Sequence, residues 1–329
     1  MANVICDNPD ETPKAHCNKR RLDDKESRRW VDATGQAADL LTAGASRVMV
    51  IADREADLYE MFACRPEGVD VLVRANHNRA LADGGWLDES CDDKPELGRA
   101  TVELPPVPGR AARVARIALR ARRVDIKRPK RNRAHWAAAL PPSVELTLVE
   151  AREINPPAGE TPLHWRLLTT RMVENLADAH IIVGFYRRRW TIEQVFRVMK
   201  TRGFDIEAVP IQENAPLKNL GCATLIAAIQ IQQMLHDRDG LATRPMTDVF
   251  EADDRPIIEA IGTTLEGRTE RQRNPHPLGS LAHAAWICAR LGGWTGYYGK
   301  PGPIVLIRGH QRLLTMLEGI KRSALVRIR

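Results

Sequence analysis

Four polar residues with a regular spacing lie between positions 186 and 200. Tyr186, Arg189, Glu193 and Lys200 fall in the stretch YRRRWTIEQVFRVMK, which offers a phenol, several cations and one carboxylate. Residues three, four or seven apart share one face of a helix, so the spacing predicts that these side chains project together. The alternative interpretation is a surface helix in which Arg189 and Glu193 form an ordinary ion pair.

A second candidate group lies far upstream, in the sequence IADREAD. Segment 47–52 (RVMVIA) is apolar and rich in β-branched residues, which predicts a buried strand ending at Asp53. Functional groups gather at the carboxyl ends of strands in parallel sheets, so Asp53 is a candidate for chemistry. It could equally cap the helix that follows, and the two roles are compatible. Trp165, within PLHWRLLTT, is a third candidate, although a tryptophan in a strand more often belongs to the core.

The elements around these residues read as an α/β protein. A helix at 23–41, a strand at 47–52, a helix at 55–64 and a strand at 69–74 predict a parallel strand–helix–strand unit. Residues 75–159 are rich in proline and contain two alternating segments, 112–126 and 144–151, which predict an antiparallel β insertion. Further predicted elements are a strand at 164–170, helices at 175–188, 191–200 and 216–235, and a strand at 304–308. The helix at 216–235 is apolar on more than one face, which predicts that it is buried.

Composition narrows the class of protein. The net charge of +7 favours a polyanionic partner, and segment 110–133 concentrates eleven Lys or Arg residues with the single acid Asp125. A solvated basic strand and loop is the simpler explanation of that segment. The six cysteines form no Cys-x-x-Cys pair, so we expect free thiols rather than a structural zinc site. No apolar run is long enough to span a bilayer and no secretory signal is present, so the sequence predicts a cytoplasmic protein with no membrane partner.

Several separated motifs together resemble one known family, the insertion-sequence IS-four family of DDE transposases (Tn-five transposase-like). The Tyr-x2-Arg-x3-Glu-x6-Lys spacing matches the signature of that family in full, and Asp-Arg-Glu-Ala-Asp at 53–57 resembles the segment that carries its second catalytic aspartate. Weaker similarities are Lys25-Glu26-Ser27 with Trp30, Val73-Arg74 with His77, and the C-terminal segments 289–297 and 308–313. The resemblance extends over roughly residues 20 to 320.

The resemblance implies a fold and a division of the chain. The fold is an RNase H-like α/β catalytic core, incomplete at its N-terminus, with a β-rich insertion and a helical C-terminal region. The implied segments are 1–75 for the partial core, 76–162 for the antiparallel insertion, 163–209 for the rest of the core with the catalytic-glutamate helix, and 210–329 for the helical region.

The resemblance also implies a reaction, which is metal-dependent phosphoryl transfer that cuts and rejoins DNA at transposon ends. Asp53 and Glu193 would be two of three carboxylates that hold two Mg²⁺ or Mn²⁺ ions. Tyr186, Arg189, Lys200 and Arg74 would contact DNA phosphates, and Trp165 would stack on a base flipped out of the duplex. The implied partners are transposon-end and target DNA, together with a second copy of the chain on DNA.

The chain departs from the family pattern at its start. Only 22 irregular residues precede Asp23, and neither Asp7 nor Asp10 follows a convincing strand, so the first catalytic aspartate is not recognisable. We therefore expect a truncated transposase that is inactive or nearly so by itself. One alternative is a non-catalytic DNA-binding or inhibitory fragment that pairs with full-length transposase. The other is an unrelated α/β protein whose basic insertion is merely solvated.

Overall fold

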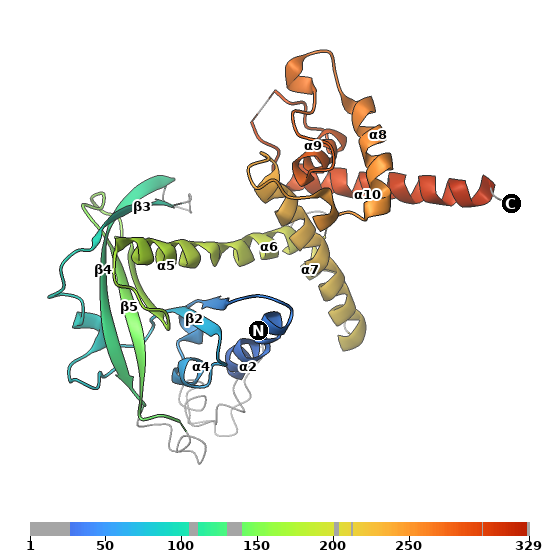
Figure 1. Cartoon of the computed structure of the whole chain (residues 1–329). Helices are drawn as coiled ribbons and strands as arrows, with labels where there is room; N and C mark the ends of the chain where they lie inside the picture. The colour runs from blue at the N-terminus through green and yellow to red at the C-terminus, as the bar shows by residue number, and fades with distance from the viewer. Residues whose placement is uncertain are drawn as a thin grey trace. The chain divides into compact units, whose positions relative to one another are not determined.

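A computed structural model describes residues 27–104, 111–129, 140–200, 204–211, 213–297 and 299–327. The chain forms two compact units that divide between Arg189 and Trp190 (Figure 1). Asp7, Asp10 and the Lys25-Glu26 part of the predicted first helix lie outside the described residues. The four-segment division predicted from the sequence stays a prediction.

The first unit is built on one six-stranded sheet, which is strongly curved in Figure 1. Its strands are β1 (Val48–Ala52), β2 (Val69–Arg74), β3 (Gly98–Leu104), β4 (Arg113–Lys127), β5 (Ser143–Glu153) and β6 (His164–Thr169). The order across the sheet is β1-β2-β6-β5-β4-β3. Strands β1 and β2 are parallel, and every later pairing is antiparallel. The sheet therefore joins a short parallel half to a long antiparallel half.

Helices cover this sheet on both faces. The helical elements of the unit are α2 (Arg28–Gln36), α3 (Asp39–Thr42), η2 (Arg54–Ala56), α4 (Tyr59–Ala63), η3 (Leu87–Glu89) and α5 (Leu176–Arg188). Helix α5 starts at the N-cap Asn175, whose side chain accepts a hydrogen bond from the Asp178 amide (3.1 Å). In Figure 1 it runs across the strands, contacting β1, β2, β4 and β5. It therefore ends close to the β1 edge of the sheet.

The sheet has a separate core on each face because successive strand residues point to opposite sides. Leu72 and Leu167 are fully buried in the core under α5, whereas their neighbours Val73 and Leu168 belong to the core that contains α4. This double burial explains why β2 and β6 are continuous apolar runs rather than alternating ones.

The predicted strands of this unit are confirmed within one or two residues, including the two long strands of the antiparallel insertion. Strand β3 was missed, since GRATVEL carries few β-branched residues and relies on pairing with β4. The helix predicted at 55–64 is broken into η2 and α4. The break occurs because Asp57 turns away to bind a neighbouring loop instead of continuing the helix.

Among its described residues, the second unit consists of helices joined by loops, with one isolated β-bridge between Pro245 and Ser280. Its elements are α6 (Trp190–Lys200), η5 (Ile206–Ala208), α7 (Asn214–Asp237), η6 (Met246–Asp248), η7 (Ala252–Asp254), α8 (Arg255–Leu265), η8 (Glu270–Gln272), α9 (Leu281–Leu291) and α10 (Pro303–Arg327). Residues 281 to 289 of α9 are all buried, so this helix forms the centre of the unit's core. Gly309 of α10 lies against the backbone of Cys288, where a Cβ would stand 1.6 Å from the carbonyl oxygen.

Two expectations for this unit are wrong. The strand predicted at 304–308 is the first part of α10, because Leu306, Leu313 and Leu317 recur at helical spacing and bury that face in the core. Helix α7 is not buried all round, since Ile226 and Ile229 on it are exposed. No described helix is both long and apolar enough to cross a membrane. The four described cysteines are free thiols, as expected.

Candidate active site

Asp53 occupies the position directly after β1, at the carboxyl end of the parallel half of the sheet. Its Oδ1 accepts a hydrogen bond from the Arg54 amide (2.8 Å) and so caps the short helix η2. The side chain is nevertheless 40% exposed. The capping role predicted as an alternative is therefore real, and it leaves the carboxylate open to solvent.

Two residues at the end of α5 reach the same carboxylate. The Tyr186 hydroxyl donates to Asp53 Oδ1 (3.2 Å), across 133 positions of sequence. The Arg189 guanidinium lies 3.5 Å from Asp53 Oδ2 and 5.9 Å from the centre of the Tyr186 ring. Helix α5 thus carries the first half of the Tyr-Arg-Glu-Lys pattern to the end of β1.

Burial determines the state of the Tyr186 hydroxyl. The side chain is buried and packs edge-on against Trp165, with 5.1 Å between ring centres. Desolvation first, and then the charge of Asp53, raise the pKa of Tyr186. The hydroxyl is therefore protonated near neutral pH and acts as a fixed donor to Asp53. Trp165 of β6 holds the Tyr186 ring in place by this edge-on packing.

A pocket of about 450 Å³ opens beside this cluster, entirely within the first unit. Its lining includes Arg54, Arg74, His164, Trp165 and Arg166. Arg74 donates to the His164 carbonyl (3.3 Å), which ties the end of β2 to the start of β6. The pocket combines several cations with an aromatic ring, a composition suited to a phosphate and a stacked planar group.

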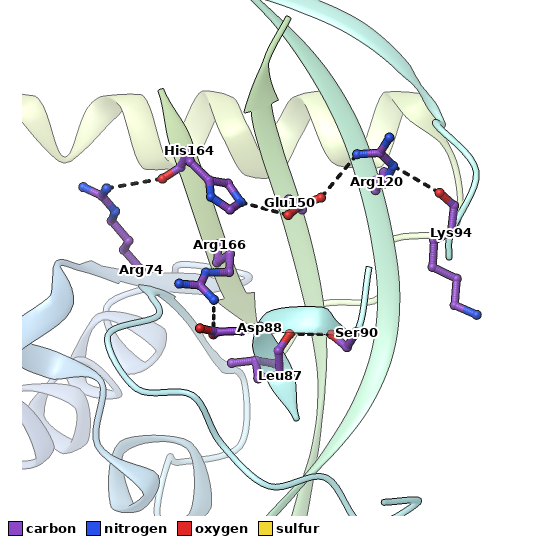
Figure 2. A network of polar contacts seen from close by, with 9 residues as sticks. All are labelled: Arg74, Leu87, Asp88, Ser90, Lys94, Arg120, Glu150, His164 and Arg166. Carbon is purple, nitrogen blue, oxygen red and sulfur yellow. Dashed lines mark hydrogen bonds and ion pairs between the residues drawn. The ribbon is translucent and has the colours of Figure 1, made fainter. Parts of the chain in front are cut away.

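The arginines of the pocket are close enough to repel one another. Burial first, and then the charges of Arg54 and Arg74, lower the pKa of Arg166. Within the described part of the chain, the carboxylate paired with this group is Asp88 of η3, which binds Arg166 (Figure 2). Three arginines and one paired carboxylate thus leave an excess of positive charge at this pocket.

A buried polar network supports the pocket from behind. Glu150 of β5 is almost fully buried, and its Oε1 lies 2.8 Å from His164 Nε2. Figure 2 shows this contact as a dashed line. Arg120 of β4 completes the chain of contacts, 3.4 Å from the other Glu150 oxygen. The hydrogen bond from His164 holds the pKa of Glu150 below its usual value. A charged Glu150 thus fixes His164 on the strand that carries Trp165.

Asp57, the last residue of the Asp-Arg-Glu-Ala-Asp block, has a structural role. Its Oδ2 accepts from the Asn76 and His77 amides (2.7 and 3.0 Å), and its Oδ1 accepts from Arg79 Nη2 (2.6 Å). Both partners of the Asp57–Arg79 ion pair are buried. Asp57 therefore holds the loop that follows Arg74 at the end of β2.

The second half of the Tyr-Arg-Glu-Lys pattern lies in α6, in the second unit. Val195, Val198 and Met199 pack into that unit's core, and Glu193 is exposed on the same helix. Lys200 Nζ binds Glu207 Oε1 (2.8 Å), and this hydrogen bond raises the pKa of Lys200. The meeting of Glu193 with Asp53 stays a prediction.

A comparison with protein-family models decides the family. The model described as "Transposase DDE domain" matches residues 27–229, which is more than half of the chain. The chain belongs to this transposase family. The match spans Asp53, Trp165, Tyr186, Arg189, Glu193 and Lys200. It supports a role in transposition and rules against the alternative of an unrelated α/β protein.

Transposases of the DDE type generally use divalent metals, and Asp53 fits the role of a metal ligand in part. It offers oxygen atoms, which Mg²⁺ and Mn²⁺ prefer, at an exposed strand end. The adjacent Arg189 competes with any cation for the same oxygen. In the described ranges, no group of three or more His, Cys, Asp or Glu side chains is placed to hold an ion.

The basic segment 110–133 contributes less free charge to the transposase domain than its composition suggests. Four of its arginines are paired with carboxylates inside the insertion: Arg113 with Glu153 and Glu160, Arg120 with Glu150 and Glu96, Arg122 with Asp83, and Arg123 with Glu145. Residues 110, 130, 131 and 133 lie outside the described residues. The described part of this strand is therefore partly neutralised.

The sequence predicted most residues of the cluster in this transposase domain but not the charged pair of Arg166 and Asp88 beside it. Asp53, Tyr186, Arg189, Trp165 and Arg74 were all predicted, and the structure brings them together around one end of the sheet. Arg166 and Asp88 were not predicted. A signal for Arg166 was present, since it directly follows Trp165, whereas nothing in the sequence indicated that Asp88 lies beside it.

Proposed function

We propose that this chain acts on DNA as an IS-four-type transposase with an RNase H-like core, and that the end of β1 is its reactive centre. The observation that carries the proposal is the contact of Tyr186 and Arg189 with Asp53. The alternative of a surface helix with an Arg189–Glu193 ion pair does not explain why Tyr186 and Arg189 both contact the carboxylate at the end of β1. The family match supports the same assignment.

The residues around Asp53 have two roles in DNA binding, which are contact with phosphates and stacking on a base. Tyr186, Arg189 and Arg74 supply donors and positive charge for DNA phosphates next to the cleaved bond, and Lys200 contributes from α6. Trp165 offers a ring on which a flipped base stacks, a contact that contributes about 1 to 3 kcal/mol in other proteins. Because Tyr186 and Trp165 pack together, base and phosphate recognition are mechanically linked.

Asp53 and Glu193 would hold the divalent ions, Mg²⁺ or Mn²⁺, and both carboxylates are solvent-accessible for that purpose. When bound, two such ions activate the attacking oxygen and stabilise the leaving oxygen of phosphoryl transfer. Arg189 and Tyr186 keep the Asp53 carboxylate oriented, and the Arg189 guanidinium would pair with a DNA phosphate when Asp53 holds a cation.

We expect the chain alone to be a weak nuclease, because the sequence supplies two recognisable carboxylates of the three in the family signature. The test is nicking of a supercoiled plasmid with Mg²⁺ or Mn²⁺. Slow nicking that disappears in Asp53→Asn and Glu193→Gln supports the proposal, with Asp39→Asn on the exposed α3 as a matched control. Rapid nicking lost in Glu193→Ala would contradict the expectation of impairment.

The same preparation separates the non-catalytic alternative. A DNA-binding or inhibitory fragment binds DNA with an affinity that falls steeply as salt rises, yet shows no metal-dependent nicking. The electropositive pocket of Arg54, Arg74 and Arg166 favours DNA binding under either reading. Absence of salt-sensitive DNA binding contradicts both.

A further inference from the structure

One arginine that lines the pocket beside Trp165, Arg166, is already paired with a carboxylate of the protein. Asp88 of η3 forms an ion pair with Arg166 at the pocket, as Figure 2 shows. Both side chains are partly exposed, 36% for Asp88 and 28% for Arg166, so solvent and ligands reach the pair. A carboxylate at this position presents two charge-bearing oxygens to a guanidinium, as a phosphate group does.

The position of Asp88 is fixed by the chain that precedes it. Its amide donates to Asn78 Oδ1 (2.9 Å), and the Leu87 amide donates to the Arg79 carbonyl (2.9 Å). The Leu87 side chain is fully buried, and Arg79 is locked by Asp57. The carboxylate is therefore presented on a rigid turn, unlike the flexible partners of most surface ion pairs.

The pocket retains positive charge in spite of this pair. Arg54, Arg74 and Arg166 all line it, and among the described residues no carboxylate forms an ion pair with the side chain of Arg54 or Arg74. One internal carboxylate therefore balances one of three arginines. The remaining two attract a polyanion, while the third must first release Asp88.

We propose that Asp88 is an internal competitor for DNA phosphate at Arg166, so that Arg54 and Arg166 are further DNA-contacting residues and the use of Arg166 requires displacement of Asp88. This inference rests on the proposed DNA-binding function. The competition weakens binding to any DNA that does not fill the whole pocket. DNA that places a phosphate and a base in the site together compensates for the lost Asp88–Arg166 ion pair. The competition by Asp88 therefore favours the specific substrate over non-specific DNA.

The test compares two substitutions that each remove one negative charge from an Asp–Arg pair. Asp88→Asn frees Arg166, whereas Asp83→Asn frees Arg122, whose pair (2.7 Å) lies outside the pocket. DNA affinity is measured by fluorescence anisotropy on a short labelled duplex over a range of salt concentrations. We expect Asp88→Asn to bind about fivefold more tightly than Asp83→Asn. Its log–log salt dependence should also steepen by about 0.9, the change for one more phosphate contact.

Two further variants separate competition from a structural effect. In the Arg166→Ala background, Asp88→Asn should bring no gain beyond that of Asp83→Asn, because the arginine that it frees is gone. Asp88→Glu keeps the charge and should remain near the wild-type affinity. Equal gains in Asp88→Asn and Asp83→Asn, or weaker binding by Asp88→Asn, would overturn the inference. If the wild-type protein itself shows no salt-sensitive binding, the proposed function fails instead.

Discussion

At the scale of single residues, the chain places one exposed carboxylate under the control of two side chains from a distant helix. Asp53 caps the turn that follows β1, which fixes its backbone, while Tyr186 and Arg189 bind the two oxygens. A carboxylate held in this way loses little freedom when it binds a ligand. The arrangement therefore suits a reactive group better than a residue that only stabilises the fold.

The Tyr186 hydroxyl gives a pH-dependent signature. Folding raises its pKa, so the folded chain keeps the phenol proton at a pH at which the unfolded chain loses it. The contribution to stability is complete below about pH 10 and falls as the pH rises through the folded pKa. We expect Tyr186→Phe to show a smaller loss of stability between pH 9 and pH 11 in urea unfolding. The control is Tyr297→Phe at an exposed site, and its free energy of unfolding should fall over this pH range as that of the wild type does.

The buried Asp57–Arg79 pair should be among the most sensitive positions in the first unit. Asp57→Ala leaves a buried guanidinium and two loop amides without their partner, which should lower the free energy of unfolding by about 3 to 5 kcal/mol. The exposed Arg28–Asp32 pair is the control, and Asp32→Ala should cost less than about 1 kcal/mol. Equal losses in the free energy of unfolding for the two variants would show that the buried pair does not hold the loop in place.

At the scale of elements, the close contact between α9 and α10 depends on a glycine. In Gly309→Ala the new methyl group meets the backbone of Cys288, which cannot rotate away. We expect thermal unfolding to report a loss of about 3 kcal/mol or more. Gly319→Ala on the same helix is the matched control, because its Cβ meets nothing within 4 Å. It should stabilise the helix slightly, by up to about 1 kcal/mol.

The same helix carries a buried histidine that makes the second unit sensitive to acid. Burial lowers the pKa of His310 to about 4, whereas the unfolded chain binds the proton from about pH 6.5. The contribution of neutral His310 to the free energy of unfolding is therefore complete above pH 6.5 and is lost as the pH falls through 4. The loss is of the order of 3 kcal/mol. His310→Leu should reduce the difference in urea stability between pH 7 and pH 4.5. His236→Gln, on the exposed side of α7, should leave it unchanged.

The elements that were predictable from sequence are those with a strong local pattern. The apolar runs of β1, β2 and β6 and the alternation of β4 and β5 determine their strands. The start of α10 was mistaken for a strand because PIVLI has a local preference for extended structure that packing on α9 overrides. Strand β3 escaped notice because its stabilising partner is β4 rather than its own sequence.

The site was predictable as far as its motifs extend. The Tyr-Arg-Glu-Lys spacing and the Asp-Arg-Glu-Ala-Asp block led to Asp53, Tyr186 and Arg189, which the fold brings together. The Asp88–Arg166 and Glu150–His164 contacts join residues 78 and 14 positions apart through sheet pairing and loop placement. Such contacts depend on tertiary structure and carry no local signal.

At the scale of the whole molecule, positive charge is distributed differently from its density in the sequence. The arginine-rich strand β4 is largely engaged with acids of its own insertion, while the arginines around Trp165 are concentrated in one pocket with a single paired acid. We therefore expect this pocket to attract a polyanion.

We propose that Asp53 and Glu193 are both ligands of the divalent ions that this transposase uses. Localised backbone cleavage by Fe²⁺ substituted at the metal site, in the presence of ascorbate and peroxide, tests this claim without requiring nuclease activity. We predict cuts near residue 53 and near residue 193 that Mg²⁺ suppresses, and that are lost together in Asp53→Asn but not in Asp39→Asn. Cuts that avoid residue 53, or that persist in Asp53→Asn, would contradict the account.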